Sequence, residues 1–272
     1  MRILSLMAGA LFLGGLALTG CRTQLNSAAG GYEPMLVPPI KDLTVDDTAE
    51  LWFDFKGQAS TGIFSDYQSH DFFEQAGLDL VWQTKIGIPY LYGNVGFSGW
   101  LGEFNIANNT QFTPPTDHAF NFYGGTGQLG FMIGWPIHEI MLFGVGLQIA
   151  SSYEAGEYAA FRAQSAQTDY VIDDSPSPWS GSLGINVELT RYWPQSTMRI
   201  GVVLGLEDFN LLGYSVVGRP GVGWSQTSGD LVGFDLKAYW LLRVQDAFLG
   251  ISLHTVELRS LGISVEVGTK LF

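Results

Sequence analysis

Apolar and polar side chains alternate with a period of two along most of the chain after residue 50. Successive side chains of a β-strand point to opposite faces, so this pattern predicts strands with one apolar and one polar face. Ten segments carry the pattern, and most exceed the roughly 9–11 residues with which a tilted strand crosses a bilayer. They are residues 51–59, 73–86, 89–102, 119–134, 138–152, 180–192, 197–208, 230–243, 247–256 and 261–272.

The connections between these segments are short and long by turns. The short ones are residues 87–88, 135–137, 193–196 and 244–246, and the long ones are 60–72, 103–118, 153–179 and 209–229. The last connection, near 257–260, is short although it falls among the long ones. Outer-membrane barrels have short periplasmic turns and long outer loops. We therefore expect an all-β fold, an antiparallel transmembrane β-barrel of about ten strands; eight or twelve also fit the pattern.

The composition of the two faces distinguishes a membrane barrel from a soluble one. In 197–208 the apolar face includes Met198, Ile200 and Leu204, whereas the other face carries Arg199 and Gly201. The polar faces of the other strands are also rich in small and uncharged polar residues and poor in charges. A soluble barrel exposes its polar face and has many charges on it, so the pattern favours an apolar face in lipid and a crowded polar lumen. A soluble β domain on a lipid tether remains the alternative.

Composition supports this interpretation. Charged residues make up 14% of the chain, whereas about a quarter is usual for soluble domains. The chain has 35 glycines and 14% aromatic residues. The net charge of −13 argues against nucleic acid as a partner. After Cys21 no apolar run reaches the 18 or so residues of a spanning helix, so a mature protein that spans the membrane must do so as a barrel.

The first residues have the layout of an export signal. Arg2 precedes the apolar stretch 3–18, and Leu18-Thr19-Gly20-Cys21 follows it. This stretch resembles the lipobox of bacterial lipoproteins, in which the cysteine is acylated and becomes the first mature residue. The resemblance implies a signal peptide over 1–20 and a covalent lipid on Cys21, the only cysteine of the chain. A free thiol, or a simple signal peptide cleaved nearby, is the alternative.

The expected domain order follows from these segments. Residues 21–49 are polar and contain three prolines, so we interpret them as a lipidated N-terminus and flexible tether, with the barrel over 50–272. The lipobox resemblance implies an anchor in the periplasmic leaflet of the bacterial outer membrane. Membrane lipid, lipoprotein-processing enzymes and the barrel assembly machinery are then the expected partners. No cofactor is expected beyond the covalent lipid, and the ligand is left open.

Aromatic residues mark two levels along the predicted strands. Trp52, Trp135 and Trp193 lie near the short turns, and Trp100 and Tyr123 lie toward the long connections. Aromatic rings favour both membrane interfaces, so these residues are expected to form two girdles.

The polar face of each predicted strand places charged side chains inside the expected barrel. A narrow lumen requires them to be paired, because an unpaired buried charge is costly. Six acids and five bases nearly balance, which indicates ion pairs that fill a narrow or closed lumen. These residues are Asp54, Lys56, Asp79, Lys85, Glu188, Arg199, Glu207, Asp235, Lys237, Glu266 and Lys270.

Candidate catalytic groups are few, and no nucleophile-elbow, zinc-protease or phosphate-loop motif is present. His254 and Ser252 lie on the same, lumen-facing side of their predicted strand, and the next strand brings Ser264 and Glu266 near them. A Ser–His–acid set of this kind needs a base oriented by an acid and in contact with a hydroxyl. We expect a non-enzymatic envelope or surface-loop role and no metal site. A small pore or passive channel and an outer-membrane lipid hydrolase are the alternatives.

Overall fold

The computed structural model describes most of the predicted strands and parts of the connecting segments. The described residues are 23–25, 35–40, 49–62, 72–86, 90–106, 118–165, 171–173, 178–207, 234–255 and 260–272. The signal peptide and Cys21 lie outside these ranges.

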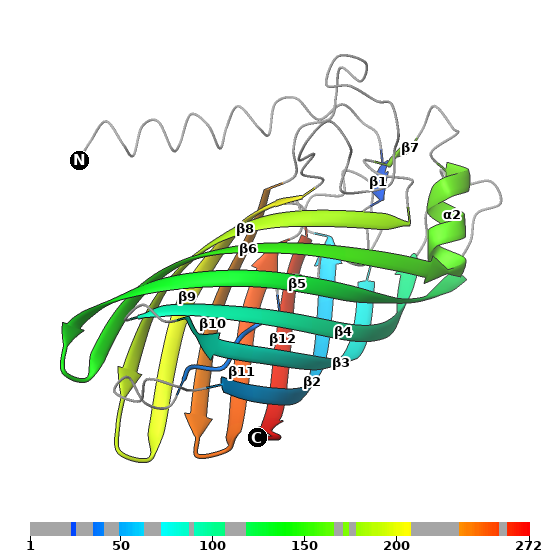
Figure 1. Ribbon diagram of the computed structural model, residues 1–272. Coiled ribbons are helices and arrows are strands. Elements are labelled where there is room, and N and C mark those ends of the chain that lie inside the picture. The colour runs from blue at the N-terminus through cyan, green and yellow to red at the C-terminus, as the bar shows by residue number, and fades with distance from the viewer. Residues whose placement is uncertain are drawn as a thin grey trace, which may run out of the picture.

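Among the described residues, ten strands form one closed antiparallel barrel. Each strand pairs with the next along the chain, and the last pairs with the first, so the all-β barrel fold is confirmed (Figure 1). The strands are β2 (Ala49–Gly62), β3 (Phe72–Lys85), β4 (Leu91–Ile106), β5 (His118–His138), β6 (Met141–Gly156), β8 (Trp179–Tyr192), β9 (Ser196–Glu207), β10 (Phe234–Val244), β11 (Ala247–Thr255) and β12 (Ser260–Lys270).

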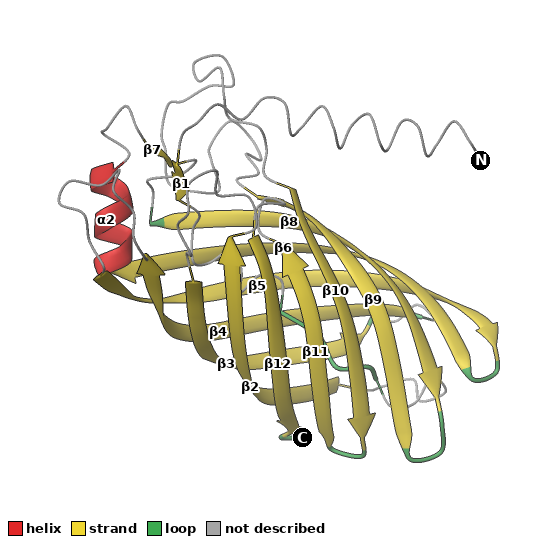
Figure 2. Cartoon of the chain, turned by 180° about the vertical axis from the view of Figure 1, so that it is seen from behind, coloured by secondary structure: helices red, strands yellow, loops and turns green. Residues whose placement is uncertain are grey.

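The two ends of the barrel differ in their connections. At the end that we call the short-turn end, β3–β4, β5–β6, β8–β9 and β10–β11 are joined by two to five residues. The opposite, long-connection end carries residues 63–71, 107–117, 157–178, 208–233 and 256–259. The helix α2 (Glu157–Ser165) and the short strands β1 (Thr23–Leu25) and β7 (Val171–Asp173) lie at the long-connection end (Figure 2). The C-terminus lies at the short-turn end.

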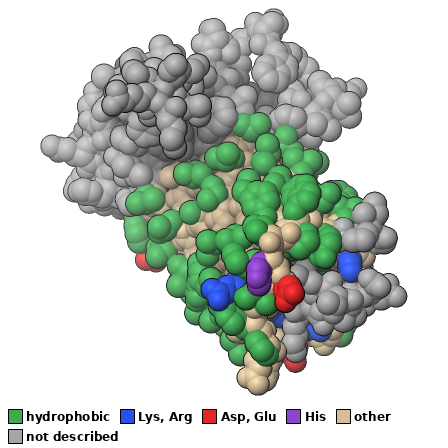
Figure 3. Space-filling model, turned by 90° about the vertical axis from the view of Figure 1, so that its left-hand side faces the viewer, with side chains coloured by type: hydrophobic (Ala, Val, Ile, Leu, Met, Phe, Trp, Pro, Cys, Tyr) green, Lys and Arg blue, Asp and Glu red, His purple; other side chains and the backbone are tan. Residues whose placement is uncertain are grey.

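The wall of the barrel is apolar outside and polar inside. Phe97, Leu101 and Leu204 point outward and are 62, 64 and 56% exposed, whereas Lys56 and Glu266 point inward and are fully buried. Hydrophobic side chains cover much of the described part of the face in Figure 3. Leaving such a side chain in water forgoes about 1.5–3 kcal/mol, so the outer face suits a lipid environment.

Glycines on the inner face make room for large side chains. Gly201 pairs with Tyr239 across β9 and β10, and a Cβ atom at Gly201 would overlap the Tyr239 ring. Gly124 lies in the same way against Trp100 of β4. The high glycine content of the polar parity therefore reflects close packing inside a narrow barrel.

Two expectations about the aromatic girdles were wrong. Trp135 and Trp193 are exposed near the short-turn end, as predicted, but Trp52 and Trp100 are buried in the lumen. Both share the inward parity of their strands, so the pleat turns them away from lipid. The predicted turn at 135–137 also lies within β5, which continues to His138 through an irregular register after Pro136.

No helix among the described residues has the length and apolarity needed to cross a membrane.

Candidate functional site in the barrel lumen

Residues Met35–Ile40 lie inside the barrel, and we call them the lumen segment. Met35 and Leu36 are buried against side chains of several walls, including Trp52, Val81 and Tyr239. Ile40 is buried nearer the short-turn end in a second apolar cluster. The segment therefore packs along the inside of the wall.

Polar side chains of three strands hold the backbone of the lumen segment. Gln128 of β5 accepts a hydrogen bond from the Met35 N–H at 2.8 Å and donates to the Met35 carbonyl at 3.3 Å. Arg199 of β9 donates to the Val37 carbonyl at 2.9 Å. Arg243 of β10 donates to the Pro39 carbonyl at 2.8 Å. The anchored carbonyls belong to alternate residues, which is the repeat of an extended chain.

For residues 35–40 the structure differs from the expected flexible tether. The six residues are Met-Leu-Val-Pro-Pro-Ile, all without polar side chains. Pro38 and Pro39 have no backbone N–H, so their burial leaves no donor without a partner. Prolines in this stretch predicted a solvated linker, but here they reduce the cost of placing backbone inside a protein.

An ion pair near the short-turn end links the wall to the lumen segment. Both terminal nitrogens of Arg243 lie 2.8 Å from the carboxylate oxygens of Glu50, and these side chains are 1 and 5% exposed. Glu50 also accepts hydrogen bonds from Gln83 at 2.9 Å and from the Trp52 indole at 3.2 Å. The Arg243 guanidinium lies 4.7 Å from the centre of the Trp52 ring. Neither Glu50 nor Arg243 was among the lumen charges predicted from the sequence.

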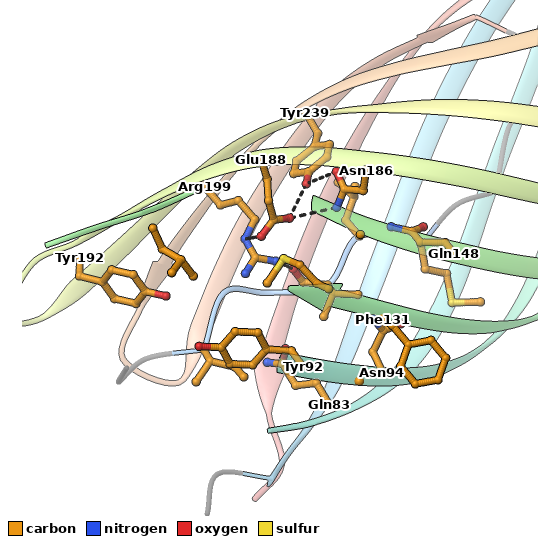
Figure 4. Close-up of a pocket in the computed structure, with 18 residues that line it drawn as sticks. Gln83, Tyr92, Asn94, Phe131, Gln148, Asn186, Glu188, Tyr192, Arg199 and Tyr239 are labelled. Atoms are coloured by element: carbon orange, nitrogen blue, oxygen red, sulfur yellow. Dashed lines mark hydrogen bonds and ion pairs between the residues drawn. The ribbon is translucent and has the colours of Figure 1, made fainter. Parts of the chain in front are cut away.

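A second ion pair lies on the wall formed by β8, β9 and β10 (Figure 4). Arg199 Nε is 3.1 Å from Glu188 Oε1, and the same nitrogen donates to Thr190 Oγ1 at 3.1 Å. The Tyr239 hydroxyl donates to Glu188 Oε2 at 2.9 Å, and Asn186 donates to that oxygen at 3.0 Å. Because Arg199 also holds the Val37 carbonyl, this network too is tied to the lumen segment.

The structure gathers most of the predicted lumen charges inside the barrel. Asp54, Lys56, Asp79, Glu188, Arg199, Lys237 and Glu266 are buried, and Lys85, Asp235 and Lys270 are partly buried. The side chain of Glu207 lies outside the described part. Lys56 Nζ is 3.8 Å from Glu266 Oε1, and Lys270 Nζ is 3.5 Å from Glu50 Oε1. A carboxyl pair, Asp54 and Asp79, occupies opposed positions of β2 and β3.

The candidate catalytic residues do not form a Ser–His–acid set. Ser252 and Ser264 bond each other at 2.6 Å, and Glu266 pairs with Lys56. In the described part of the chain, neither ring nitrogen of His254 has a hydrogen-bond partner. All four candidates are at most 4% exposed and face the lumen, away from the lipid-facing surface.

Aromatic side chains fill the lumen toward the long-connection end. Tyr158 of α2 is buried, with its ring centre 4.5 Å from that of Phe104 and 5.4 Å from that of Phe73. On the next turn, Arg162 Nε lies 3.5 Å from Glu154 Oε1, and both side chains are almost fully buried. The first turns of α2 therefore pack on the inner wall. Arg162 and Glu154 are lumen charges that fall in the connection 153–179 expected from the sequence, outside the predicted strands.

Little space is left beside the lumen segment. The cavity between it and the β4–β6 and β8–β10 walls has a volume of about 30 Å³ (Figure 4). That is room for about two water molecules. A smaller cavity of about 10 Å³ lies by Lys237 and His254. The described part of the lumen is thus packed with side chains and with the chain's own N-terminal segment.

Comparison with known proteins identifies no family. No family model matches the chain, and no curated protein matches it. Among solved structures, it is similar to the β domain of the Bordetella autotransporter BrkA, with a TM-score of 0.46, 8% identity, and coverage of 82% of this chain and 99% of that one.

Two other similar structures are also outer-membrane or surface proteins. An outer membrane channel from Pseudomonas putida F1 has a TM-score of 0.43 and 9% identity over 87% of this chain and all of that one. Neisserial surface protein A has a TM-score of 0.35 and 10% identity over 81% of this chain and 96% of that one. At identities this low, none of these proteins' activities transfers to this chain.

Proposed function

We propose that this protein is a non-enzymatic β-barrel of a bacterial outer membrane whose lumen is closed in the resting state. Its role is then carried by the long-connection face rather than by passage of solute. One observation carries the proposal: the lumen segment and a set of paired charges fill an interior whose outer wall is apolar.

The membrane location follows from the outer wall. In a soluble barrel, side chains such as Phe97 and Leu101 would lie in water, at a cost that no feature of the described fold offsets. In a bilayer the same side chains are solvated by acyl chains. A closed barrel also pairs the backbone N–H and C=O groups of every strand within the sheet. This argument disfavours the alternative of a soluble β domain on a lipid tether.

Planar-bilayer recording of the purified mature protein tests the closed lumen. We expect no conductance steps from protein whose insertion is shown by heat-modifiable mobility and by protection of the barrel from protease. Discrete, reproducible steps from the unmodified protein would overturn the proposal and favour an open pore.

Lipidation of Cys21 is part of the proposal. It is supported by the lipobox-like stretch and by the position of Cys21 ahead of the barrel. Metabolic labelling with an alkyne fatty acid is expected to label the wild-type protein and not the Cys21→Ser variant. Equal labelling of both would exclude Cys21 as the lipid site.

A regulated channel is the second candidate function. It is favoured because four hydrogen bonds hold the backbone of the lumen segment and none of its own side chains is charged. Withdrawal of the segment breaks these hydrogen bonds but none of the strand pairings that close the barrel. A channel of this kind would be silent in the unmodified protein and open when the segment is displaced.

The geometry disfavours a lipid hydrolase built on His254. Its ring touches neither serine hydroxyl through a hydrogen bond, and Glu266 is engaged by Lys56. The His254→Ala variant is expected to leave release of fatty acid from phospholipid micelles at the background level of the wild type. Release by the wild type that disappears in this variant would revive the hydrolase.

A further inference from the structure

The strand nearest the N-terminus lies at the long-connection end of the barrel. β1 pairs in parallel with β7, with Thr23 opposite Val171 and Leu25 opposite Asp173. β7 belongs to the connection between α2 and β8, and Figures 1 and 2 both show β1 and β7 beside the end that carries α2. The chain two residues after Cys21 is therefore located at this end.

The lumen segment runs from the middle of the barrel toward the short-turn end. Met35 contacts Gly96 and Gln128, several residues inside β4 and β5. Ile40 packs with Tyr92 and Leu142, which lie next to short turns. The chain then reaches Ala49, where β2 begins opposite Thr84 at the short-turn end. The described residues thus mark three successive levels: β1 beyond the long-connection end, Met35 within the barrel, and Ile40 near the short-turn end.

Chain length decides how Leu25 and Met35 are connected. The ten peptide steps between them span at most about 33 Å. A route outside the barrel would first return from Met35 to the short-turn end, about 15 Å, and then climb the tilted wall, roughly 25 Å more. Because the barrel is closed by hydrogen-bonded strands all round, the chain has no side exit. Only the direct route through the long-connection mouth fits the available length.

We propose that the chain is threaded through its own barrel, entering at the long-connection end and leaving at the short-turn end. Cys21, two residues before β1, then lies on the long-connection side. This inference rests on the proposed outer-membrane function, in which short turns face the periplasm. It places an acylated Cys21 at the cell-surface leaflet, whereas the lipobox resemblance alone implied the periplasmic leaflet. At the long-connection end, the protein would then bind the outer leaflet of the membrane through the acyl chains of its own Cys21.

Three epitope-tagged versions of the full chain test the threading in intact cells. A ten-residue epitope is inserted between Arg22 and Thr23 in the first, within residues 166–170 in the second, and between Gln195 and Ser196 in the third. Antibody is added before and after permeabilisation of the outer membrane. We expect the first two tags to bind antibody equally in both conditions and the short-turn tag to bind only after permeabilisation.

The three tags separate failure of the threading from failure of the proposed function. If the tag after Arg22 binds only after permeabilisation while the 166–170 tag binds in intact cells, the threading is wrong. If the short-turn tag binds antibody in intact cells, the proposed membrane orientation is wrong, and the threading is then judged by whether the first tag behaves like the 166–170 tag.

A thiol variant keeps the test decisive if the first tag disturbs folding. Asn26→Cys, one residue beyond β1, introduces a single unacylated thiol, with Asp246→Cys in a short turn as the matched control. Threading predicts modification of Asn26→Cys in intact cells by a membrane-impermeant maleimide, and of Asp246→Cys only after permeabilisation. Modification of Asn26→Cys no faster in intact cells than that of the control would overturn the threading.

Discussion

Arg243 joins Glu50 and the lumen segment in one contact. Its guanidinium forms a two-point ion pair with the Glu50 carboxylate and donates to the carbonyl of Pro39, all at 2.8 Å. The pair therefore connects two barrel strands that are not neighbours in the sheet, β2 and β10, through the lumen and holds the segment that occupies it. Such a contact makes the stability of the wall depend on the presence of the segment.

Replacing Arg243 by methionine is expected to lower the free energy of unfolding by about 3 kcal/mol, because it leaves the buried Glu50 carboxylate without its main partner. Lys270 and Gln83 still contact Glu50, which keeps the loss at the lower end of the usual range. Reversible urea unfolding from lipid vesicles measures the change. Arg191→Met, on an exposed arginine, is the matched control and is expected to cost less than about 1 kcal/mol. Equal effects of the two variants would contradict a structural role for the Arg243–Glu50 pair.

An arginine on the outer wall tests the lipid-facing surface. Val265 lies in the middle of β12 and is 43% exposed. In a bilayer, Val265→Arg is expected to destabilise the barrel by about 2–4 kcal/mol, whereas Gln195→Arg in a short turn is expected to change it by less than about 0.5 kcal/mol. Urea unfolding in vesicles gives both values. A neutral or stabilising effect of Val265→Arg would mean that this wall faces water.

The barrel wall was predictable from the sequence because its signal is local. The alternation at Arg199–Leu204, for example, assigned each side chain to the face that the structure shows. The alternation of short turns with long connections can also be read directly from the spacing of the predicted strands. The face of each side chain therefore follows from the pleat, whereas the pattern left eight, ten or twelve strands open until the closed sheet showed ten.

The contents of the lumen were predictable only in part. Glu50 was missed because the first strand was expected to begin one residue later, and Arg243 because it stands at the last position of its predicted strand. Residues 35–40 were interpreted as a tether because their partners, such as Gln128 and Arg243, are about 93 and 204 residues distant. The available signal was an uncharged apolar run with two prolines, flanked by polar segments. Because proline has no backbone N–H, such a run can be buried with few unpaired hydrogen-bond donors.

Gly201 and Gly99 are expected to respond differently to substitution by alanine. At Gly201 a methyl group would overlap the Tyr239 ring, so Gly201→Ala forces that ring away from Glu188 and Asn186. Overpacking of this kind costs about 1–3 kcal/mol. At Gly99 an added Cβ atom would have no neighbouring atom of the described chain within 4 Å, so Gly99→Ala is expected to be neutral to within about 0.5 kcal/mol. Vesicle unfolding distinguishes them, and equal tolerance at both positions would contradict the packed lumen.

Planar-bilayer recording of two matched variants tests most directly whether the N-terminal segment closes the lumen. In one variant Gly-Ser-Gly-Ser-Gly-Ser replaces residues 35–40, which removes the apolar packing but keeps the chain length. In the other, the same sequence replaces residues 41–46. The first variant is expected to show discrete conductance steps, interrupted by closures, while the second and the wild-type protein stay silent. Silence of the first variant after verified insertion, or equal conductance of both variants, would contradict closure of the barrel by Met35–Ile40.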